Sequence, residues 1–272
     1  MRTCAAVIST ACLVAACTQP GRPADNARGT PAQGLVESEF FSQELGRDVR
    51  HCLWMPARAQ NTRVPLLLVL HGRGRHRRSL IEQPGVIESL QSVSFAIAFP
   101  DGDDGWWIDA PAMASAHYQS MLLEFISVVE NRYPAGGCAE MRAVTGWSMG
   151  GFGAVSLAQN HPDLVCAVSS MIGLLDFPAG EGYPVPLGRF GRDRQVWIAF
   201  TPSAKAKRLR GKAVAVFSCS DGFDAPQNRA FHEALKREGI EHHYEVLPGG
   251  HTMKTVLLAW PKVLEFHGAN WE

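Results

Sequence analysis

Short apolar runs alternate along this chain with segments in which apolar residues recur at helical spacing. The runs have the length and the aliphatic content of buried strands, and residues 64–70 are the clearest case. Strands are expected at 36–42, 48–55, 64–70, 93–99, 143–145, 164–170, 212–219 and 242–247. Helical spacing predicts helices at 79–91, 116–132, 152–160, 192–200, 227–238 and 253–266.

The order of these segments predicts the fold class. Strands that alternate with helices form βαβ units, which favour a mostly parallel sheet with helices on both faces. Leu45-Gly46-Arg47 separates the first two strands, which favours an antiparallel hairpin at the N-terminal edge. Residues 171–210 form a long excursion interrupted by Gly and Pro. No internal repeat or second domain is found, so we expect one α/β domain over residues 36–272.

The N-terminal residues have a different pattern. Arg2 precedes an apolar stretch at about 5–16, which ends in Val14-Ala15-Ala16-Cys17 and is typical of an export signal. The last four residues resemble the lipobox of bacterial lipoproteins, in which the cysteine is lipidated. We therefore expect a signal peptide with lipobox at 1–17, lipid attachment at Cys17 and a flexible linker at 18–35. The alternative is an ordinary cleaved signal that contains a cysteine.

This interpretation predicts an exported protein. It would be held on the bacterial cell envelope, periplasmic or at the outer surface, by a membrane anchor at its N-terminus. The full chain is 46% hydrophobic and 19% charged, as expected of a globular core. Lys+Arg and Asp+Glu balance at 26 each, so no overall field favours nucleic acid, and no nucleic-acid partner is predicted.

The cysteines outside the leader do not predict a metal site. They form no Cys-x-x-Cys pair and lie beside no histidine cluster. An exported protein could pair them in three ways, and the sequence does not choose among these pairings or free buried thiols. The residues concerned are Cys52, Cys138, Cys166 and Cys219.

Ser148 is the candidate nucleophile. It is the centre of a Gly-x-Ser-x-Gly pattern that follows an apolar run and precedes a helical segment. A serine in such a strand–turn–helix context projects its hydroxyl above the sheet. Acyl transfer also needs two backbone N–H donors for the oxyanion. The residue after the nucleophile, Met149, supplies one, and Arg73 in the loop after strand 64–70 is expected to supply the other.

A serine nucleophile needs a base, and the base needs an acid to orient it. His251 follows strand 242–247 in a Gly-Gly-His loop and is the expected base. Two aspartates follow strand 212–219, and either could reach the imidazole. Asp221 lies nearer to its strand and is preferred, with Asp224 as a structural residue such as a helix N-cap.

Several motifs together resemble the "putative esterase" family of the α/β-hydrolase superfamily, which includes esterase D (S-formylglutathione hydrolase), tributyrin esterases and antigen 85 mycolyltransferases. They are Leu70-His71-Gly72, Pro100-Asp101-Gly102, Trp106-Trp107, Gly146–Gly151, His161-Pro162, Asn228–Phe231 and Gly249–Thr252. The resemblance implies an α/β-hydrolase fold, a Ser–Asp–His triad and acyl-ester chemistry without metal or organic cofactor. It also places Trp106 and Trp107 beside the active site, where they contact substrate or pack the loop onto the domain.

Two departures from the family pattern stand out. Cys219-Ser220 occupies a region where relatives often carry glycine, which leaves the acid open between Asp221 and Asp224. Residues 72–78 are rich in arginine, either as a solvated loop or as a site for an anionic substrate.

The expected function is an exported serine carboxylesterase that acts on small-molecule, lipid or sugar esters through a covalent acyl-enzyme. The alternatives are an acyltransferase that uses a sugar or lipid hydroxyl in place of water, and a non-catalytic surface-binding lipoprotein.

Overall fold

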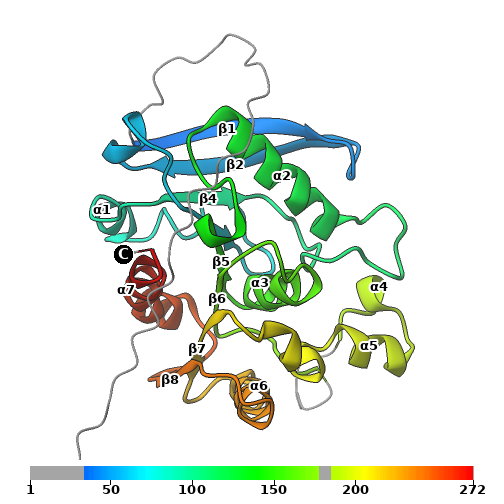
Figure 1. Cartoon of the computed structure of the whole chain (residues 1–272). Coiled ribbons are helices and arrows are strands. Elements are labelled where there is room, and N and C mark those ends of the chain that lie inside the picture. Colours follow the sequence, from blue (N-terminus) through cyan, green and yellow to red (C-terminus); the bar gives the residue numbers. More distant parts are fainter. Residues whose placement is uncertain (1–33, 178–184, 272) are drawn as a thin grey trace, which may run out of the picture.

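The computed structural model describes residues 34–177 and 185–271, which form one sheet with helices around it (Figure 1). The strands are β1 (Gly34–Ser42), β2 (Arg47–Met55), β3 (Leu66–Leu70), β4 (Ala96–Pro100), β5 (Arg142–Gly146), β6 (Ala167–Met171), β7 (Ala213–Cys219) and β8 (His243–Leu247). The helices are α1 (Val86–Leu90), α2 (Tyr118–Arg132), α3 (Met149–Asn160), α4 (Leu187–Phe190), α5 (Arg194–Phe200), α6 (Ala225–Arg237) and α7 (Met253–Ala269). Short 3-10 helices are η1 (Ala57–Gln60), η2 (Ala139–Met141) and η3 (Pro202–Leu209).

The sheet has eight strands in the order β1-β2-β4-β3-β5-β6-β7-β8. Strands β1 and β2 form the predicted hairpin, and β2 pairs antiparallel with β4. All pairs from β4 through β3 to β8 are parallel. The expected fold class, a mostly parallel sheet with an antiparallel N-terminal edge and helices on both faces, is confirmed.

Helices cover both faces of the sheet. Successive residues of a strand point to opposite faces, so each strand contributes to two cores. Leu66 and Leu68 of β3 belong to the core beneath α2, α3 and α6, whereas Leu67 and Val69 belong to the core beneath α1 and α7. Figure 1 shows these two helical layers on either side of the strands. The alternating burial explains why the central strands are apolar at every position.

Some predicted boundaries differ from the structure. The helix predicted at 79–91 shortens to α1, because Gly85 before it has a φ of 78° and the preceding residues form turns. The excursion at 171–210 holds α4 and η3 besides the single helix expected. β1 begins at Gly34, so the last two residues of the predicted linker lie in a strand.

The predicted signal peptide, Cys17 and the linker up to residue 33 lie outside the described residues. Within residues 34–177 and 185–271, no helix is long and apolar enough to cross a membrane. No disulfide joins the four cysteines of this part of the chain.

Candidate active site

Ser148 lies at the turn between β5 and α3, with a φ of 55° and a ψ of −121° that few side chains adopt. Its N–H donates to the Met171 carbonyl at 3.0 Å, and its own carbonyl accepts from the Phe152 N–H at 3.1 Å. A β-carbon at Gly150 would lie 1.9 Å from the Leu70 carbonyl oxygen, so the turn requires glycine there. This tight turn holds the Ser148 hydroxyl at the end of β5.

Ser148, His251 and Asp224 form one line of hydrogen bonds. The His251 Nε2 lies 2.8 Å from the Ser148 Oγ, and the His251 Nδ1 lies 2.8 Å from the Asp224 Oδ1. Ser148 follows β5, His251 follows β8 and Asp224 follows β7, so the parallel sheet brings the three residues to one edge. The His251 side chain is 17% exposed and that of Asp224 is fully buried. Solvent therefore reaches the serine end of the line more readily than the acid.

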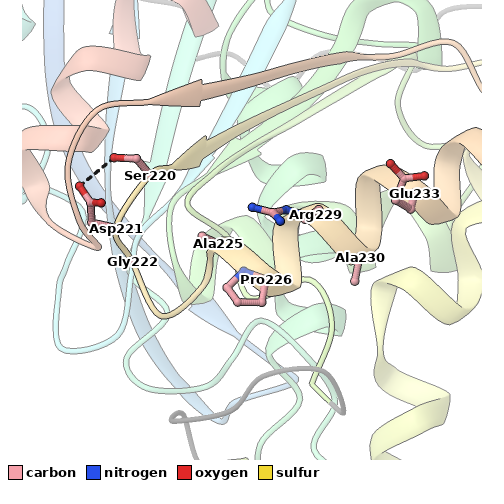
Figure 2. A pocket seen from close by; sticks show the side chains of 8 residues that line it. All are labelled: Ser220, Asp221, Gly222, Ala225, Pro226, Arg229, Ala230 and Glu233. Carbon is pink, nitrogen blue, oxygen red and sulfur yellow. Dashed lines mark hydrogen bonds between the residues drawn. The ribbon is translucent and has the colours of Figure 1, made fainter.

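The preference for Asp221 over Asp224 is wrong on this geometry. Asp221 accepts a hydrogen bond from the Ser220 Oγ at 2.8 Å (Figure 2), and the carboxylate that faces the His251 ring is that of Asp224. The cause is the path of the loop, because the Asp221 N–H donates to the Gly249 carbonyl at 3.0 Å and fixes the backbone there. Asp224 lies at the N-cap position of α6, as the alternative proposed, but its carboxylate makes no capping bond and turns to the imidazole instead.

Asp224 is surrounded by donors. Its Oδ1 lies 3.2 Å from the Cys219 Sγ, and its Oδ2 accepts from the Asn228 Nδ2 at 2.9 Å. Burial, and then the negative charge of Asp224, raise the pKa of the Cys219 thiol to about 12. The thiol therefore stays protonated at neutral pH and can donate to the carboxylate. Together with His251, these groups satisfy a charge that would otherwise be costly to bury.

Sequence reasoning did not assign Cys219 and Asn228 to the site. Asn228 carried a detectable signal, because it lies four residues after Asp224 in a predicted helix, and that spacing brings Asn and Asp side chains together. Cys219 carried none, since a cysteine at the end of an apolar strand is equally consistent with a buried core thiol.

A cleft of about 150 Å³ opens beside Ser148 and His251. The expected oxyanion donors belong to segments that meet there, because Met149 is the first residue of α3 and Arg73 lines the cleft. A β-carbon at Gly72 would lie 3.3 Å from the Ser148 Cβ, so the loop after β3 lies directly against the nucleophile. The cleft is lined by Gly72, Arg73, Arg75, Trp147, Ser148, Ile172, His251, Thr252, Met253 and Val256.

Trp106 and Trp107 do not line this cleft, which corrects the expectation of substrate contacts. Both side chains are buried, at 1% and 0% exposure. The Trp107 Nε1 donates to the His71 carbonyl at 3.1 Å, and Trp106 packs edge-on against Phe152 and Phe177. They pack their loop onto the domain, the second possibility that the sequence left open, and Trp107 thereby supports the loop that carries Arg73.

A second, larger hollow of about 600 Å³ lies along α6 (Figure 2). Asp221, Arg229 and Glu233 line it, but Ser148 and His251 do not.

Within the described residues, no three His, Cys, Asp or Glu side chains converge as metal ligands. The chemistry that the arrangement near Ser148 can perform is proton removal from a hydroxyl by an imidazole whose other nitrogen is held by a carboxylate.

The chain resembles known esterases over most of its length. A family model described as "Putative esterase" matches residues 42–264. An esterase of Mycobacterium tuberculosis (strain H37Rv) is 23% identical over 227 residues, which cover 70% of this chain and 49% of that protein. The chain thus spans about half the length of this curated relative.

Solved structures share the fold. A ferulic acid esterase superposes with a TM-score of 0.76 at 23% identity, covering 87% of this chain and 98% of that one. S-formylglutathione hydrolase from Agrobacterium tumefaciens superposes with a TM-score of 0.76 at 16% identity, covering 88% and 95%. These superpositions agree with the α/β-hydrolase fold implied by the sequence motifs. Because the family model spans most of the chain, this protein belongs to the putative esterase family.

Proposed function

We propose that this protein is a serine carboxylesterase that cleaves acyl esters through a covalent acyl-enzyme. The observation that carries the proposal is the line of hydrogen bonds from the Ser148 Oγ through both ring nitrogens of His251 to the Asp224 carboxylate. This is the arrangement that activates a serine hydroxyl, because the imidazole accepts its proton while the carboxylate fixes the tautomer. Membership of an esterase family supports the same reaction class.

In this mechanism the Ser148 Oγ attacks the ester carbonyl carbon while its proton moves to the His251 Nε2. The Asp224 carboxylate stabilises the imidazolium through the Nδ1–H bond. The N–H groups of Met149 and Arg73 are proposed to bind the oxyanion, a contribution of about 3 kcal/mol per donor. His251 then returns its proton to the departing alcohol. Water, activated by the same imidazole, attacks the acyl-enzyme and releases the acid.

Labelling with a fluorophosphonate probe and hydrolysis of 4-nitrophenyl esters of increasing acyl length test this proposal. The wild-type protein should label and turn over, whereas Ser148→Ala should do neither. Ser127→Ala is the matched control, because Ser127 is exposed on α2 and its hydroxyl bonds only within that helix. A folded protein that neither labels nor hydrolyses any ester contradicts the esterase proposal and favours a non-catalytic binding protein.

Product analysis distinguishes an acyltransferase from a hydrolase. With a sugar or lipid alcohol added to the assay, a transferase forms the new ester, and a hydrolase forms the free acid at an unchanged rate.

We also propose that the protein is exported and lipid-anchored through Cys17. The support is the sequence of residues 1–34 alone, with its short apolar run, lipobox-like end and Pro/Gly-rich continuation. Expressed with its leader in a bacterium, the wild type should partition into the detergent phase of Triton X-114. Cys17→Ser should move to the aqueous phase, and equal partitioning of both would contradict an anchor at this residue.

A further inference from the structure

Arginine side chains border the cleft beside the candidate nucleophile. Arg73 and Arg75 both line it, whereas none of its lining residues is acidic. The chain as a whole has equal numbers of basic and acidic residues, so this positive charge is a local feature of the cleft. A local charge at a binding site attracts and orients a ligand of opposite sign more than it contributes to the fold.

The arginines of this loop fall into two groups: Arg73 and Arg75 line the cleft, and Arg77 and Arg78 pair with acidic residues. Arg77 is nearly buried and both its terminal nitrogens have acidic partners, because Nη1 donates to Asp101 at 3.0 Å and Nη2 to Glu37 at 3.2 Å. Arg78 pairs with Glu37 and donates to Glu82 at 2.7 Å. Acidic partners therefore neutralise the two arginines that lie farther along the loop, away from the cleft lining.

The segment from Arg73 to Arg75 is held in place by its backbone. The Gly74 N–H donates to the Asp104 Oδ1 at 2.7 Å, and the Arg75 N–H donates to the Gly72 carbonyl at 3.1 Å. The second carboxylate oxygen of Asp104 faces the Arg73 Nε at 3.7 Å, which offsets part of that charge. Arg75 is exposed and forms no ion pair within residues 34–177 and 185–271.

We propose that the ester bound by this cleft carries an anionic group, a carboxylate or a phosphate, and that Arg75 binds this group. The inference rests on the proposed esterase function and specifies its substrate class. A guanidinium presents a planar fork of donors that matches carboxylate and phosphate oxygens. The cleft of about 150 Å³ accommodates only a few substrate atoms beside Ser148, so the anionic group would extend to the exposed rim where Arg75 lies.

Two pairs of esters, each pair differing only in charge, test the proposal. Mono-4-nitrophenyl adipate and 4-nitrophenyl methyl adipate place the charge on the acyl side. 4-Acetoxybenzoate and its methyl ester place the charge on the alcohol side. The measured quantity is the ratio of kcat/KM for the anionic ester to that for its neutral partner. In the wild type this ratio should exceed one for at least one pair, and 0.5 M NaCl should lower it.

Arg75→Gln should lower that ratio three- to tenfold, mainly through KM, while hydrolysis of the neutral ester stays within twofold. Arg75→Lys should keep part of the preference, because it retains the charge without the fork. Arg229→Gln is the matched control, since it removes an equal charge from the larger hollow along α6.

An unchanged ratio in Arg75→Gln, or an equal fall in Arg229→Gln, would overturn the proposal. A wild-type ratio of one or less for both pairs would overturn it as well. Failure of the esterase function itself looks different, because the neutral esters would then not be hydrolysed and Ser148 would not label.

Discussion

At the scale of single residues, the carboxylate of Asp224 has two possible partners, the backbone at the start of α6 and the ring of His251. It occupies the N-cap of α6, where a carboxylate ordinarily accepts from the helix backbone. Here the carboxylate faces the His251 Nδ1 and also accepts from the Cys219 Sγ and the Asn228 Nδ2. The helix loses a capping bond, and the imidazole gains a buried carboxylate that two further side chains hold in place.

Asp224→Asn should therefore reduce kcat by about 10⁴, because an amide no longer holds the imidazole in the tautomer that accepts the serine proton. Asp221→Asn is the matched variant three residues away and should leave kcat within about twofold. Steady-state hydrolysis of 4-nitrophenyl acetate measures both. The reverse order of effects would restore Asp221 as the acid and refute the observed loop geometry.

We expect Cys219 to contribute a hydrogen bond to Asp224 in addition to filling space in the core. Cys219→Val keeps the volume and the strand preference but removes the donor, and kcat should fall about fivefold. Cys219→Ser keeps a donor and should retain kcat within about threefold, although it fills the site less well. If both variants lose stability in thermal melts but keep the same kcat, the thiol serves only the core.

Ser148 and His251 could be chosen as candidates from sequence because their signals are local: a glycine-bounded turn after a strand, and a Gly-Gly-His loop after another. The structure places the two side chains 2.8 Å apart. The choice between Asp221 and Asp224 is not local. It depends on the bond from the Asp221 N–H to Gly249, which forms only when β7 and β8 pair. The burial of Trp106 likewise depends on Phe177, which is distant in sequence.

At the scale of elements, the junction of β5 and α3 depends on the neighbouring strand β3. Helix α3 starts so close to the end of β3 that the backbone of Leu70 occupies the space where a side chain at Gly150 would stand. The turn that strains Ser148 is therefore maintained by packing between strands as well as by its own sequence.

Gly150→Ala should lower the free energy of unfolding by more than about 3 kcal/mol, because the added carbon would overlap backbone atoms that cannot move aside. Urea denaturation measures the change. Gly188→Ala in α4 is the control, since nothing lies within 4 Å of its added carbon, and it should shift stability by less than about 1 kcal/mol. Equal effects of the two substitutions would contradict the close approach.

Most elements could be predicted because most strands are apolar runs and the helices α2, α6 and α7 bury one face at helical spacing. The prediction failed where tertiary contacts override local preference. The segment before α1 has helical spacing but winds into turns, as Pro84-Gly85 interrupts it. The short helix α4 has only four residues, too few to show a period, and η3 buries only Pro202, Ala206 and Leu209 where it packs against α3 and α6.

At the scale of the whole molecule, each face of the sheet contains a buried histidine. His51 of β2 packs among Phe40 and Phe125 beneath α2, and burial, followed by the positive charge of Arg132, lowers its pKa to about 4. His267 of α7 lies on the opposite face, and burial lowers its pKa to about 3. Both are neutral in the folded protein at neutral pH.

Acid should therefore destabilise the fold well above the range in which carboxylates titrate. Below pH 6.5 the unfolded chain binds protons that the folded chain does not, so stability is complete above about pH 6.5 and falls as the pH drops toward 4. From pH 8 to pH 5, His51 alone should account for a loss of about 2 kcal/mol.

His51→Phe should remove about that share of the loss, as measured by urea denaturation at the two pH values. The control is Phe40→Leu, because Phe40 packs against His51 but carries no titratable group, so this variant should keep the wild-type slope. If the free energy of unfolding of His51→Phe changed with pH as much as that of the wild type, burial of His51 would not be the cause of the pH dependence.

The sheet order places the two partners of Ser148 at its margin. β8 pairs only with β7 within the described sheet, and the loops after these two strands carry His251 and Asp224. Marginal strands open at lower free energy than central ones, so detachment of β8 would separate the imidazole from Ser148 while β3 to β6 remain folded. We therefore expect the proposed catalytic activity to be lost before the fold. Under gradual denaturation the molecule would pass through a state that is still structured but already inert.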